Sequence, residues 1–224
     1  MIAIANRVYG REFYMISEQD SLDSLLARAQ SGDEDAMAIL FDQYGRRLRQ
    51  MIRLRLDRRL QGRVDPSDVL QEAYLDARRK LPNYSTKDDL PFFLWLRLVV
   101  GQKLTDCHRY HLGAKMRDAG REISLHQGPM PMATSFALAA QLLGKMTTPS
   151  RAAMRAESRL RIQEALDAMD PIDREVLTLR HFEVLSNSET AQVLKLSQAA
   201  ASNRYVRALK RMKRILQETH GEED

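Results

Sequence analysis

The sequence predicts an all-α protein made of two helical domains joined by a flexible linker. Apolar side chains recur at helical spacing through much of the 224 residues, and runs of β-branched residues are few. Glycine (10) and proline (7) are scarce, which favours helices over a sandwich or barrel. At roughly 100–200 residues per domain, this length corresponds to one or two domains. Glycines and prolines gather between residues 113 and 155, so two domains and a linker are favoured.

The first 63 residues end in an arginine-rich stretch. Residues 18–63 have the apolar spacing of helices, with a junction at 31–33. Between Arg46 and Arg63 there are eight arginines and one acid, interleaved with apolar residues, which predicts an amphipathic helix with a basic face. The whole chain has 27 arginines and 8 lysines and a net charge of +5. Arginine suits phosphate binding, but codon bias in a GC-rich genome would explain the same excess.

Two further helices are expected in the first domain. Asp65 and Pro66 form a helix start, because an aspartate can cap and proline suits the first helical position. This helix is expected to extend to about Lys80. A polar loop follows at 83–89, and the next helix is expected at 92–112. Some of its large apolar side chains are assigned to the core, and these are Phe93, Trp95, Leu96 and Val99.

The second half of the chain begins with the linker and ends with several short helices. A short helix at 136–143 is expected inside the linker. Asp170 and Pro171 repeat the cap-and-proline start and open a helix that is expected to reach Arg180. The chain is thus divided into an N-terminal extension at 1–17, a first domain at 18–112, a linker at 113–155, a second domain at 156–219 and a tail at 220–224.

The strongest local pattern is a helix-turn-helix near the C-terminus. Ser186 and Glu189 fit a capping box for a short helix at 187–194, and Ser197 can cap a longer helix at about 198–217. The longer helix begins with short side chains and then carries six cations and no acid. A recognition helix has this arrangement, because its first side chains reach base edges and its later cations contact phosphates.

Three stretches resemble bacterial RNA polymerase sigma factors. Residues 170–214 resemble region 4 of these proteins, and residues 65–81 (DPSDVLQEAYLDARRKL) resemble region 2.2. Residues 92–110 (FFLWLRLVVGQKLTDCHRY) resemble regions 2.3 and 2.4. Region 3 has no counterpart except the linker, which is the layout of the extracytoplasmic-function (ECF) group. The resemblance implies a sigma region 2-like bundle and a sigma region 4-like helix-turn-helix, joined by the linker.

The same resemblance implies a function and partners. A sigma factor binds core RNA polymerase as a dissociable subunit and directs promoter-specific transcription initiation. Its partners would be the β′ clamp helices, the β flap, promoter DNA and, in many ECF factors, an anti-sigma protein. The residues that would bind the β′ clamp helices are Asp68, Gln71 and Glu72. Acidic and amide groups on an exposed helix can pair with arginines of a partner, although a solvated polar face is the alternative.

DNA contacts are implied for both domains. The minus-ten element must be opened, so its extruded bases need a pocket and planar side chains. The residues expected there are Asn83, Tyr84, Ser85, Thr86, Gln102, Lys103, Asp106, His108 and Arg109. Region 4 would bind the minus-thirty-five duplex, where Gln and Asn can bond adenine and Arg can bond guanine. The residues expected there are Gln198, Ala200, Ser202, Asn203, Arg204, Arg207, Lys210 and Arg211.

The chain departs from the family pattern at three places. Lys195 stands where a turn glycine is usual, so it must accept a positive φ or form a different turn. Ser202 stands where a basic residue is common, so a base preference cannot be transferred. Residues 100–102 (VGQ) replace the common Ala-Arg-Asn of region 2.3, which leaves the detailed minus-ten contacts open.

Other classes of protein are disfavoured. No run of about 18 apolar residues exists, so no membrane insertion is expected. The single cysteine, Cys107, excludes an internal disulfide, and a cytoplasmic location is expected. His108 and His111 lack a well-placed carboxylate or thiol partner, so neither metal nor cofactor is expected. No phosphate-binding loop, zinc-protease motif or nucleophile elbow occurs, and we expect no enzyme activity.

One alternative function stays open at this point. Residues 174–191 share a pattern with LuxR-like helix-turn-helix regulators, which bind DNA without being polymerase subunits. Such proteins usually carry a ligand or receiver domain. Residues 18–112 show no strand alternation and no phospho-acceptor arrangement, which disfavours this alternative.

Overall fold

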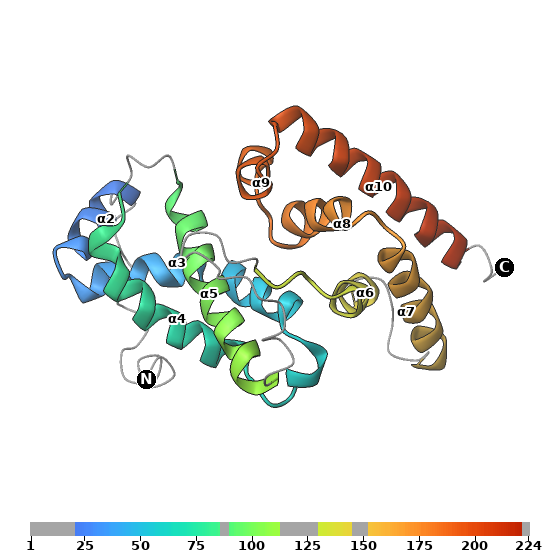
Figure 1. The fold of residues 1–224 in the computed structure, drawn as a ribbon, viewed down its shortest axis with the longest axis horizontal. Coiled ribbons are helices and arrows are strands. Elements are labelled where there is room, and N and C mark those ends of the chain that lie inside the picture. The colour runs from blue at the N-terminus through green and yellow to red at the C-terminus, as the bar shows by residue number, and fades with distance from the viewer. Residues whose placement is uncertain (1–20, 86–89, 113–129, 145–151, 221–224) are drawn as a thin grey trace, which may run out of the picture.

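The computed structural model describes residues 21–85, 90–112, 130–144 and 152–220 (Figure 1). These residues form α-helices with short 3₁₀ and π turns, and no strand occurs among them, so the all-α prediction is confirmed. None of the helices in the described ranges is long and apolar enough to cross a membrane. The α-helices are α2 (Leu22–Gln30), α3 (Glu34–Arg55), α4 (Pro66–Lys80), α5 (Phe92–Leu112), α6 (Ser135–Gly144), α7 (Ala152–Asp167), α8 (Pro171–Leu177), α9 (Asn187–Leu194) and α10 (Gln198–His220).

Helices α2 to α5 form one bundle, called the N-terminal bundle below. Helices α3, α4 and α5 pack against one another, and α2 packs on α3. Their apolar stripes meet in one core, in which Leu40, Leu48, Leu96 and Leu104 are fully buried. The rings of Phe41 and Tyr74 join α3 to α4 edge to face, with 5.0 Å between ring centroids.

The predicted helix starts are confirmed. The Asp65 carboxylate accepts the Ser67 N–H at 2.7 Å, and Pro66 is the first residue of α4. Asp170 caps α8 in the same way, and α8 leads directly into a π-helical turn at Thr178–Phe182 that includes Arg180. Short polar caps and proline thus define these boundaries, because they satisfy amide groups that have no partner inside the helix.

Helix α6 modifies the expected linker. A short helix was expected at 136–143, and the structure has it at Ser135–Gly144. Its Leu138 and Ala139 are fully buried against α7 and neighbouring helices. Residues 130–144 are therefore packed, because the apolar face of α6 has a core to join. The expectations for 1–17, 113–129, 145–151 and 221–224 lie outside the described residues. Helix α7 begins at Ala152, which is earlier than residue 156, the expected start of the second domain.

Helices α6 to α10 form the second bundle, called the C-terminal bundle. Helix α10 packs against α7, α8 and α9, and its Ala208 and Met212 enter a core with Ile162 and Leu166 of α7. Figure 1 shows α10 along the outer edge of this bundle.

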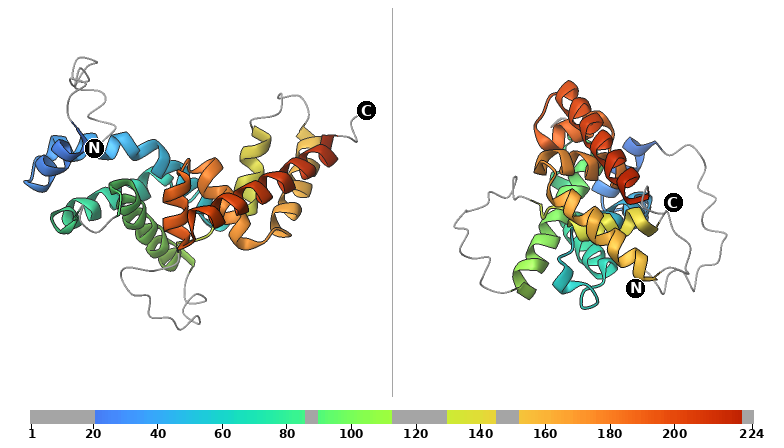
Figure 2. Two further views of the ribbon diagram at one scale, coloured as in Figure 1. Left: turned by 90° about the horizontal axis from the view of Figure 1, so that it is seen from above. Right: turned by 90° about the vertical axis from the view of Figure 1, so that its right-hand side faces the viewer.

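The two bundles touch each other. Leu179 and Leu185 of the C-terminal bundle belong to the N-terminal core, and Leu54 at the end of α3 belongs to the C-terminal core. The Thr134 N–H, just before α6, donates to the Leu54 carbonyl at 3.0 Å. Figure 2 shows the ribbon of the two bundles from two further directions. In the described structure, the two bundles therefore pack against each other across the predicted domain boundary.

Candidate nucleic-acid interface

Helices α9 and α10 form the predicted helix-turn-helix. The capping box is present, since the Ser186 hydroxyl accepts the Glu189 N–H and the Glu189 carboxylate accepts the Ser186 N–H. Lys195 adopts φ 55° and ψ 40°, so a lysine takes the left-handed turn position at which glycine was expected. Ala191 and Ala201 are buried where the two helices approach. The small side chains permit the close crossing that the motif requires.

The first turns of α10 face solvent. Ser197 caps the helix, because its hydroxyl accepts the Ala200 N–H at 3.1 Å. Gln198, Ser202 and Asn203 are exposed, and Ala200 is half-buried. The N-terminal end of the predicted recognition helix thus presents short polar side chains on an open surface, which is what contact with base edges needs.

Two predicted base-contacting arginines are already engaged. Arg207 donates from Nε and Nη2 to Asp173 at 2.6 and 2.8 Å, and Arg204 Nη1 donates to the same carboxylate at 2.7 Å. The hydrogen bonds from Arg207 come first in lowering the pKa of Asp173, those from Arg204 add to the effect, and burial opposes it. To bond a base, Arg204 and Arg207 must therefore either release their hydrogen bonds to Asp173 or use donors that these hydrogen bonds leave over.

The remaining predicted cations of α10 differ in exposure. Lys210 is exposed, whereas Arg211 is half-buried and donates to the Ala168 carbonyl at 3.3 Å. Lys210 is free to approach a phosphate, and Arg211 is tied to the end of α7.

The predicted polymerase-binding residues lie together on α4. Asp68, Gln71 and Glu72 are exposed on one face, and Leu75, which is 56% exposed, continues that face at the same helical spacing. An apolar side chain inside a polar face is typical of protein contacts. The sequence prediction did not include Leu75, although its spacing of i+7 from Asp68 could have indicated it.

The predicted minus-ten residues are only partly brought together. Tyr84 is 8% exposed and lies among Phe92 and Trp95, with 5.2 Å between the Tyr84 and Trp95 centroids. Its hydroxyl donates to the Leu90 carbonyl at 2.9 Å. The ring is thus part of the core in this structure and is not available to stack on a base, contrary to expectation. Trp95 packs against the same core, as predicted. Asn83 is exposed and Ser85 is half-buried, while Thr86 lies outside the described residues.

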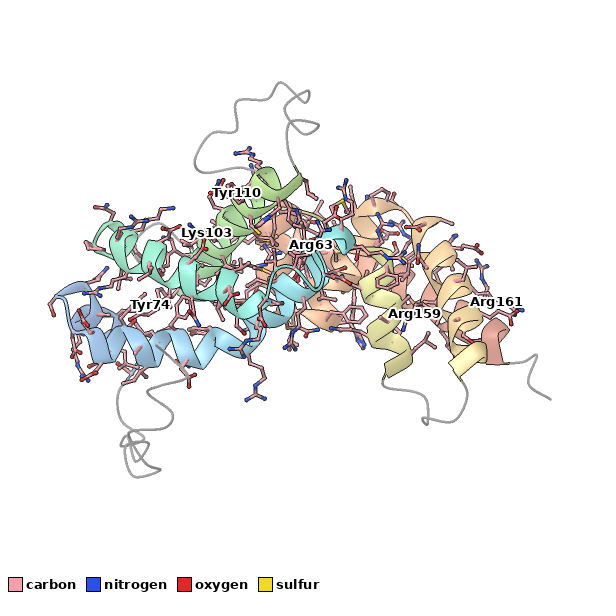
Figure 3. The ribbon with its side chains drawn as sticks, turned by 90° about the horizontal axis from the view of Figure 1, so that it is seen from below. Arg63, Tyr74, Lys103, Tyr110, Arg159 and Arg161 are labelled. Atoms are coloured by element: carbon pink, nitrogen blue, oxygen red, sulfur yellow. The ribbon has the colours of Figure 1, made fainter. Side chains whose placement is uncertain are left out.

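Helix α5 corrects two further assignments. His108 is 5% exposed and accepts the Asp57 N–H at 3.2 Å, so it does not line an open face. Lys103 turns toward α4, where its Nζ lies 3.0 Å from Asp76 and 3.6 Å from Glu72 (Figure 3). The helical period places both side chains next to α3 or α4, which spacing within α5 alone could not show. Gln102 bonds Asp106 at 3.1 Å, and Asp106 and Arg109 are exposed.

The predicted basic face of α3 is also corrected in part. Arg55 is 1% exposed and bonds Glu183 and Glu175 of the C-terminal bundle. Arg47 is half-buried and donates to the Val184 carbonyl at 2.8 Å. The sequence did carry an indication, because Leu48, Ile52 and Arg55 share one helical stripe, and a charge on an apolar stripe is usually paired.

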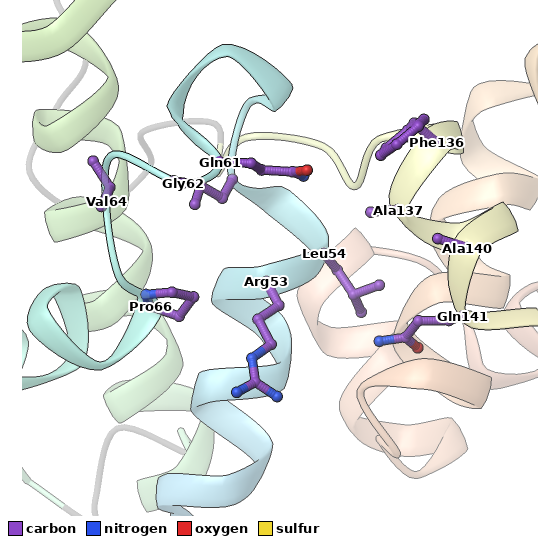
Figure 4. Close-up of a pocket in the computed structure, with 11 residues that line it drawn as sticks. Arg53, Leu54, Gln61, Gly62, Val64, Pro66, Phe136, Ala137, Ala140 and Gln141 are labelled. Carbon is purple, nitrogen blue, oxygen red and sulfur yellow. The ribbon is translucent and has the colours of Figure 1, made fainter. Parts of the chain in front are cut away.

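A hollow of about 300 Å³ lies elsewhere between the bundles. Figure 4 shows Leu54 and Gly62 on one side of it and Phe136, Ala137 and Ala140 of α6 on the other. The contact between the bundles is therefore tight around Arg55 and hollowed on the side lined by Gly62 and Ala140.

These features define a class of protein: an all-α, two-bundle protein with a helix-turn-helix whose recognition helix is open to DNA. Residues 159–212 match the family model for sigma-70, region 4. This match covers α8, α9 and most of α7 and α10.

Relatives match over both bundles. The chain is 27% identical over 199 residues to the ECF RNA polymerase sigma factor SigD of Mycobacterium tuberculosis, covering 89% of this chain and 85% of SigD. It is 26% identical over 204 residues to the RNA polymerase sigma-H factor of Pseudomonas aeruginosa, covering 91% and 96%. The solved structure of CnrH in complex with the cytosolic domain of CnrY is similar with a TM-score of 0.52 and 25% identity, covering 87% of this chain and 96% of that one.

The chain is similar to RNA polymerase sigma factors of the ECF group, and these similarities support a sigma factor that directs promoter-specific transcription. The LuxR-like alternative is not favoured, because the similarity to sigma factors extends over about nine-tenths of the chain rather than over the helix-turn-helix alone.

Proposed function

We propose that the two halves of this sigma factor divide the promoter between them. In this proposal, residues 18–112 bind core polymerase and the minus-ten element, and residues 156–219 bind the minus-thirty-five element. The observation that carries the proposal is the open N-terminal end of α10, in the segment that matches sigma-70 region 4. The residues before 18 and after 219 have no assigned role.

The minus-thirty-five element is assigned to α10. Gln198 and Asn203 can form paired hydrogen bonds with adenine, and the small Ala200 and Ser202 permit close approach to the groove. Arg204 and Arg207 can bond guanine once DNA competes with Asp173 for their guanidinium groups. Lys210 and Arg211 would position the helix on phosphates.

Core polymerase is assigned to the exposed face of α4. Asp68, Gln71 and Glu72 can pair with cations of the β′ clamp helices, and Leu75 adds an apolar contact at the C-terminal end of the face. The C-terminal bundle would contact the β flap. These assignments follow the family resemblance, and the exposure of the four side chains supports the first of them.

The minus-ten element is assigned to a smaller set than the sequence predicted. Asn83, Ser85, Gln102, Asp106 and Arg109 keep this role, because they are exposed or half-buried on α5 and the segment before it. Tyr84, Lys103 and His108 support the surface from beneath through the contacts described above. Opened bases would then bind a mainly polar face rather than a stack on Tyr84.

The proposal also covers partners and location. An anti-sigma protein is a candidate partner, supported by the likeness to CnrH, which was solved with the cytosolic domain of CnrY. We infer a cytoplasmic protein that acts as a regulatory subunit and is not itself an enzyme. Within the described ranges, no group of three or more His, Cys, Asp or Glu side chains could hold a metal ion.

Purified core polymerase provides the test. The full chain should bind core polymerase, and the double variant Asp68→Ala/Gln71→Ala should bind it more weakly while keeping the wild-type affinity for minus-thirty-five duplex DNA. Arg161→Ala, on the exposed side of α7 (Figure 3), is the control and should not change core binding. No binding of the wild-type chain to core polymerase at low salt would contradict the proposed function.

A further inference from the structure

The hollow between the bundles has mainly apolar walls. Its volume is about 300 Å³, at the lower end of the range for pockets that bind small molecules. Apolar side chains line it from both sides, and these are Leu54, Leu56, Val64, Pro66, Phe136, Ala137 and Ala140. Figure 4 shows the small residues Gly62 and Ala140 on opposite walls, and a Cβ added to Gly62 would meet no atom within 4 Å. The hollow therefore has room and apolar surface for a small ring system.

Two side-chain amides also line the hollow. Gln61 comes from the turn before α4 and Gln141 from α6, and Figure 4 shows their side chains reaching toward the hollow from the two bundles. Neither amide forms a hydrogen bond within the described part of the chain. An amide has both donors and an acceptor, so each of the two can pair with the edge of a purine, which presents donors and acceptors as well.

Arginines gather around the hollow. Arg53 lines it, and Arg63 lies between two residues that line it. The guanidinium groups of Arg58 and Arg159 lie 4.6 and 5.2 Å from the centroid of the Phe136 ring. Arg53, Arg58 and Arg63 are exposed, and none of the three forms an ion pair among the residues that the structure describes. These cations are therefore available to an anion at the hollow.

The acids in this region do not balance the arginines. Asp57 forms an ion pair with Arg59 at 2.9 Å, so those two charges cancel. The Asp65 carboxylate accepts the Ser67 N–H at the start of α4. Hydrogen bonds from Ser67 come first in lowering the pKa of Asp65, and the charge of Arg53 adds to the effect, so this carboxylate stays ionised at neutral pH. One negative charge thus faces several arginines, which favours an anion with more than one charge over a monoanion.

We propose that the hollow binds a purine nucleoside triphosphate. The apolar walls hold the base, and the amides of Gln61 and Gln141 bond its edge. Arg53, Arg58 and Arg63 bond the phosphates, because a planar guanidinium group donates paired hydrogen bonds to phosphate oxygens. Among the described residues, none of α10 lines the hollow, so the nucleotide acts as a separate effector and not as part of the promoter contact.

Calorimetric titration of the free full chain tests the proposal. ATP, GTP, adenosine and inorganic tripolyphosphate are titrated separately at about 50 mM salt, where charge interactions are less screened than at physiological salt. ATP or GTP should bind saturably at one site per chain. Adenosine and tripolyphosphate should each bind at least about tenfold more weakly than the better nucleotide, because each lacks one half of the contacts. The assay needs neither core polymerase nor DNA, so its result is independent of the proposed promoter function.

Matched variants locate the site. Arg53→Gln should weaken nucleotide binding by about tenfold or more, through loss of a charge-assisted contact. Arg78→Gln removes an exposed arginine of α4 that pairs with Glu34, and it should leave nucleotide binding unchanged. Ala140→Phe fills the hollow and should abolish nucleotide binding while the weak binding of tripolyphosphate stays, since all arginines are kept. Circular dichroism shows whether Ala140→Phe is folded, and Arg53→Gln, at an exposed position, tests the site if it is not.

Four results would overturn the nucleotide site. The first is no saturable binding of ATP or GTP by the wild-type chain. The second is adenosine or tripolyphosphate binding as tightly as the better nucleotide, which would reduce the site to an apolar surface or to a general basic surface. The others are equal losses in Arg53→Gln and Arg78→Gln, and full nucleotide affinity in folded Ala140→Phe.

Discussion

The arginines of α3 and those of α10 differ in what they do, although the sequence presents both as basic helical stretches. Arg55 is buried between two glutamates of the other bundle, whereas Arg207 keeps 61% of its side chain exposed and shares one carboxylate with Arg204. Arg47 and Arg55 of α3 join the two bundles, whereas Arg207 lies on an exposed surface that is proposed to bind DNA. Arginine content alone therefore does not identify a DNA-binding face, and the position of each arginine in the helical period decides its role.

The largest expected effect is at the buried charges of Arg55, Arg97 and Glu183. Glu183→Gln should lower the free energy of unfolding by about 3–5 kcal/mol, because it leaves Arg55 and Arg97 with too little negative charge in a buried site. Urea unfolding followed by circular dichroism measures the change. Glu157→Gln, in an exposed pair, should change it by about 0–1 kcal/mol. Equal losses of unfolding free energy in the two variants would contradict the distinction between buried and exposed arginine pairs.

Asp173 tests the role of the exposed arginines of α10. Asp173→Asn should loosen Arg204 and Arg207, so the affinity for non-specific duplex should rise relative to that for the minus-thirty-five element. We expect the specificity ratio to fall by about fivefold or more, as for the loss of one oriented base contact. Competition binding with duplexes of altered sequence measures this ratio. An unchanged ratio would show that Asp173 does not orient the two arginines for base recognition.

Single arginines and lysines of α10 should differ from each other. Arg204→Ala should weaken binding to the minus-thirty-five sequence by about 5- to 100-fold and leave non-specific binding nearly unchanged. Lys210→Ala should weaken binding to all duplexes alike and reduce the slope of log affinity against log salt by about 1. Salt titrations of both variants distinguish the roles. Uniform loss in Arg204→Ala would assign that residue to phosphates.

The smallest expected effect concerns His108, a polar group buried within one bundle. Burial lowers the pKa of this imidazole, so the unfolded chain takes up the proton first. The neutral folded form thus contributes stability above about pH 6.5, and this contribution is lost as pH falls through the lower pKa of the folded state. Since one proton is involved, the slope is at most about 1.4 kcal/mol per pH unit. The free energy of unfolding, measured between pH 7.5 and 5.5, should fall less steeply with pH in His108→Gln than in the wild-type chain. The same pH dependence in both proteins would contradict the burial of a neutral His108.

Local sequence patterns predicted much of the fold. Caps at Asp65, Asp170 and Ser186, the turn at Lys195 and the presence of a short helix near 136–143 follow from short-range rules, whereas the packing of that helix does not. These features depend only on residues that are close in sequence, so they can be predicted from a single sequence.

The contacts between distant segments could not be predicted in the same way. Tyr84 was expected in a pocket for extruded bases, and Lys103 and His108 on the face that contacts them. Instead, each contacts other parts of the N-terminal bundle: Tyr84 bonds the Leu90 carbonyl, Lys103 pairs with Asp76, and His108 accepts the Asp57 N–H. Likewise, the pairing of Arg55 with Glu183 joins residues 128 positions apart. The apolar stripe of α3 indicates that Arg55 is buried, but nothing in the sequence identifies its partner.

Transcription from a library of randomised promoters, with purified core polymerase and the full chain, tests the central claim most directly. The account predicts that the chain selects promoters with two separated sequence blocks at a constant spacing, and that Gln198→Ala/Asn203→Ala loses selection in the upstream block only. Selection of a single or palindromic block bound without polymerase, or no promoter selection at all, would contradict it.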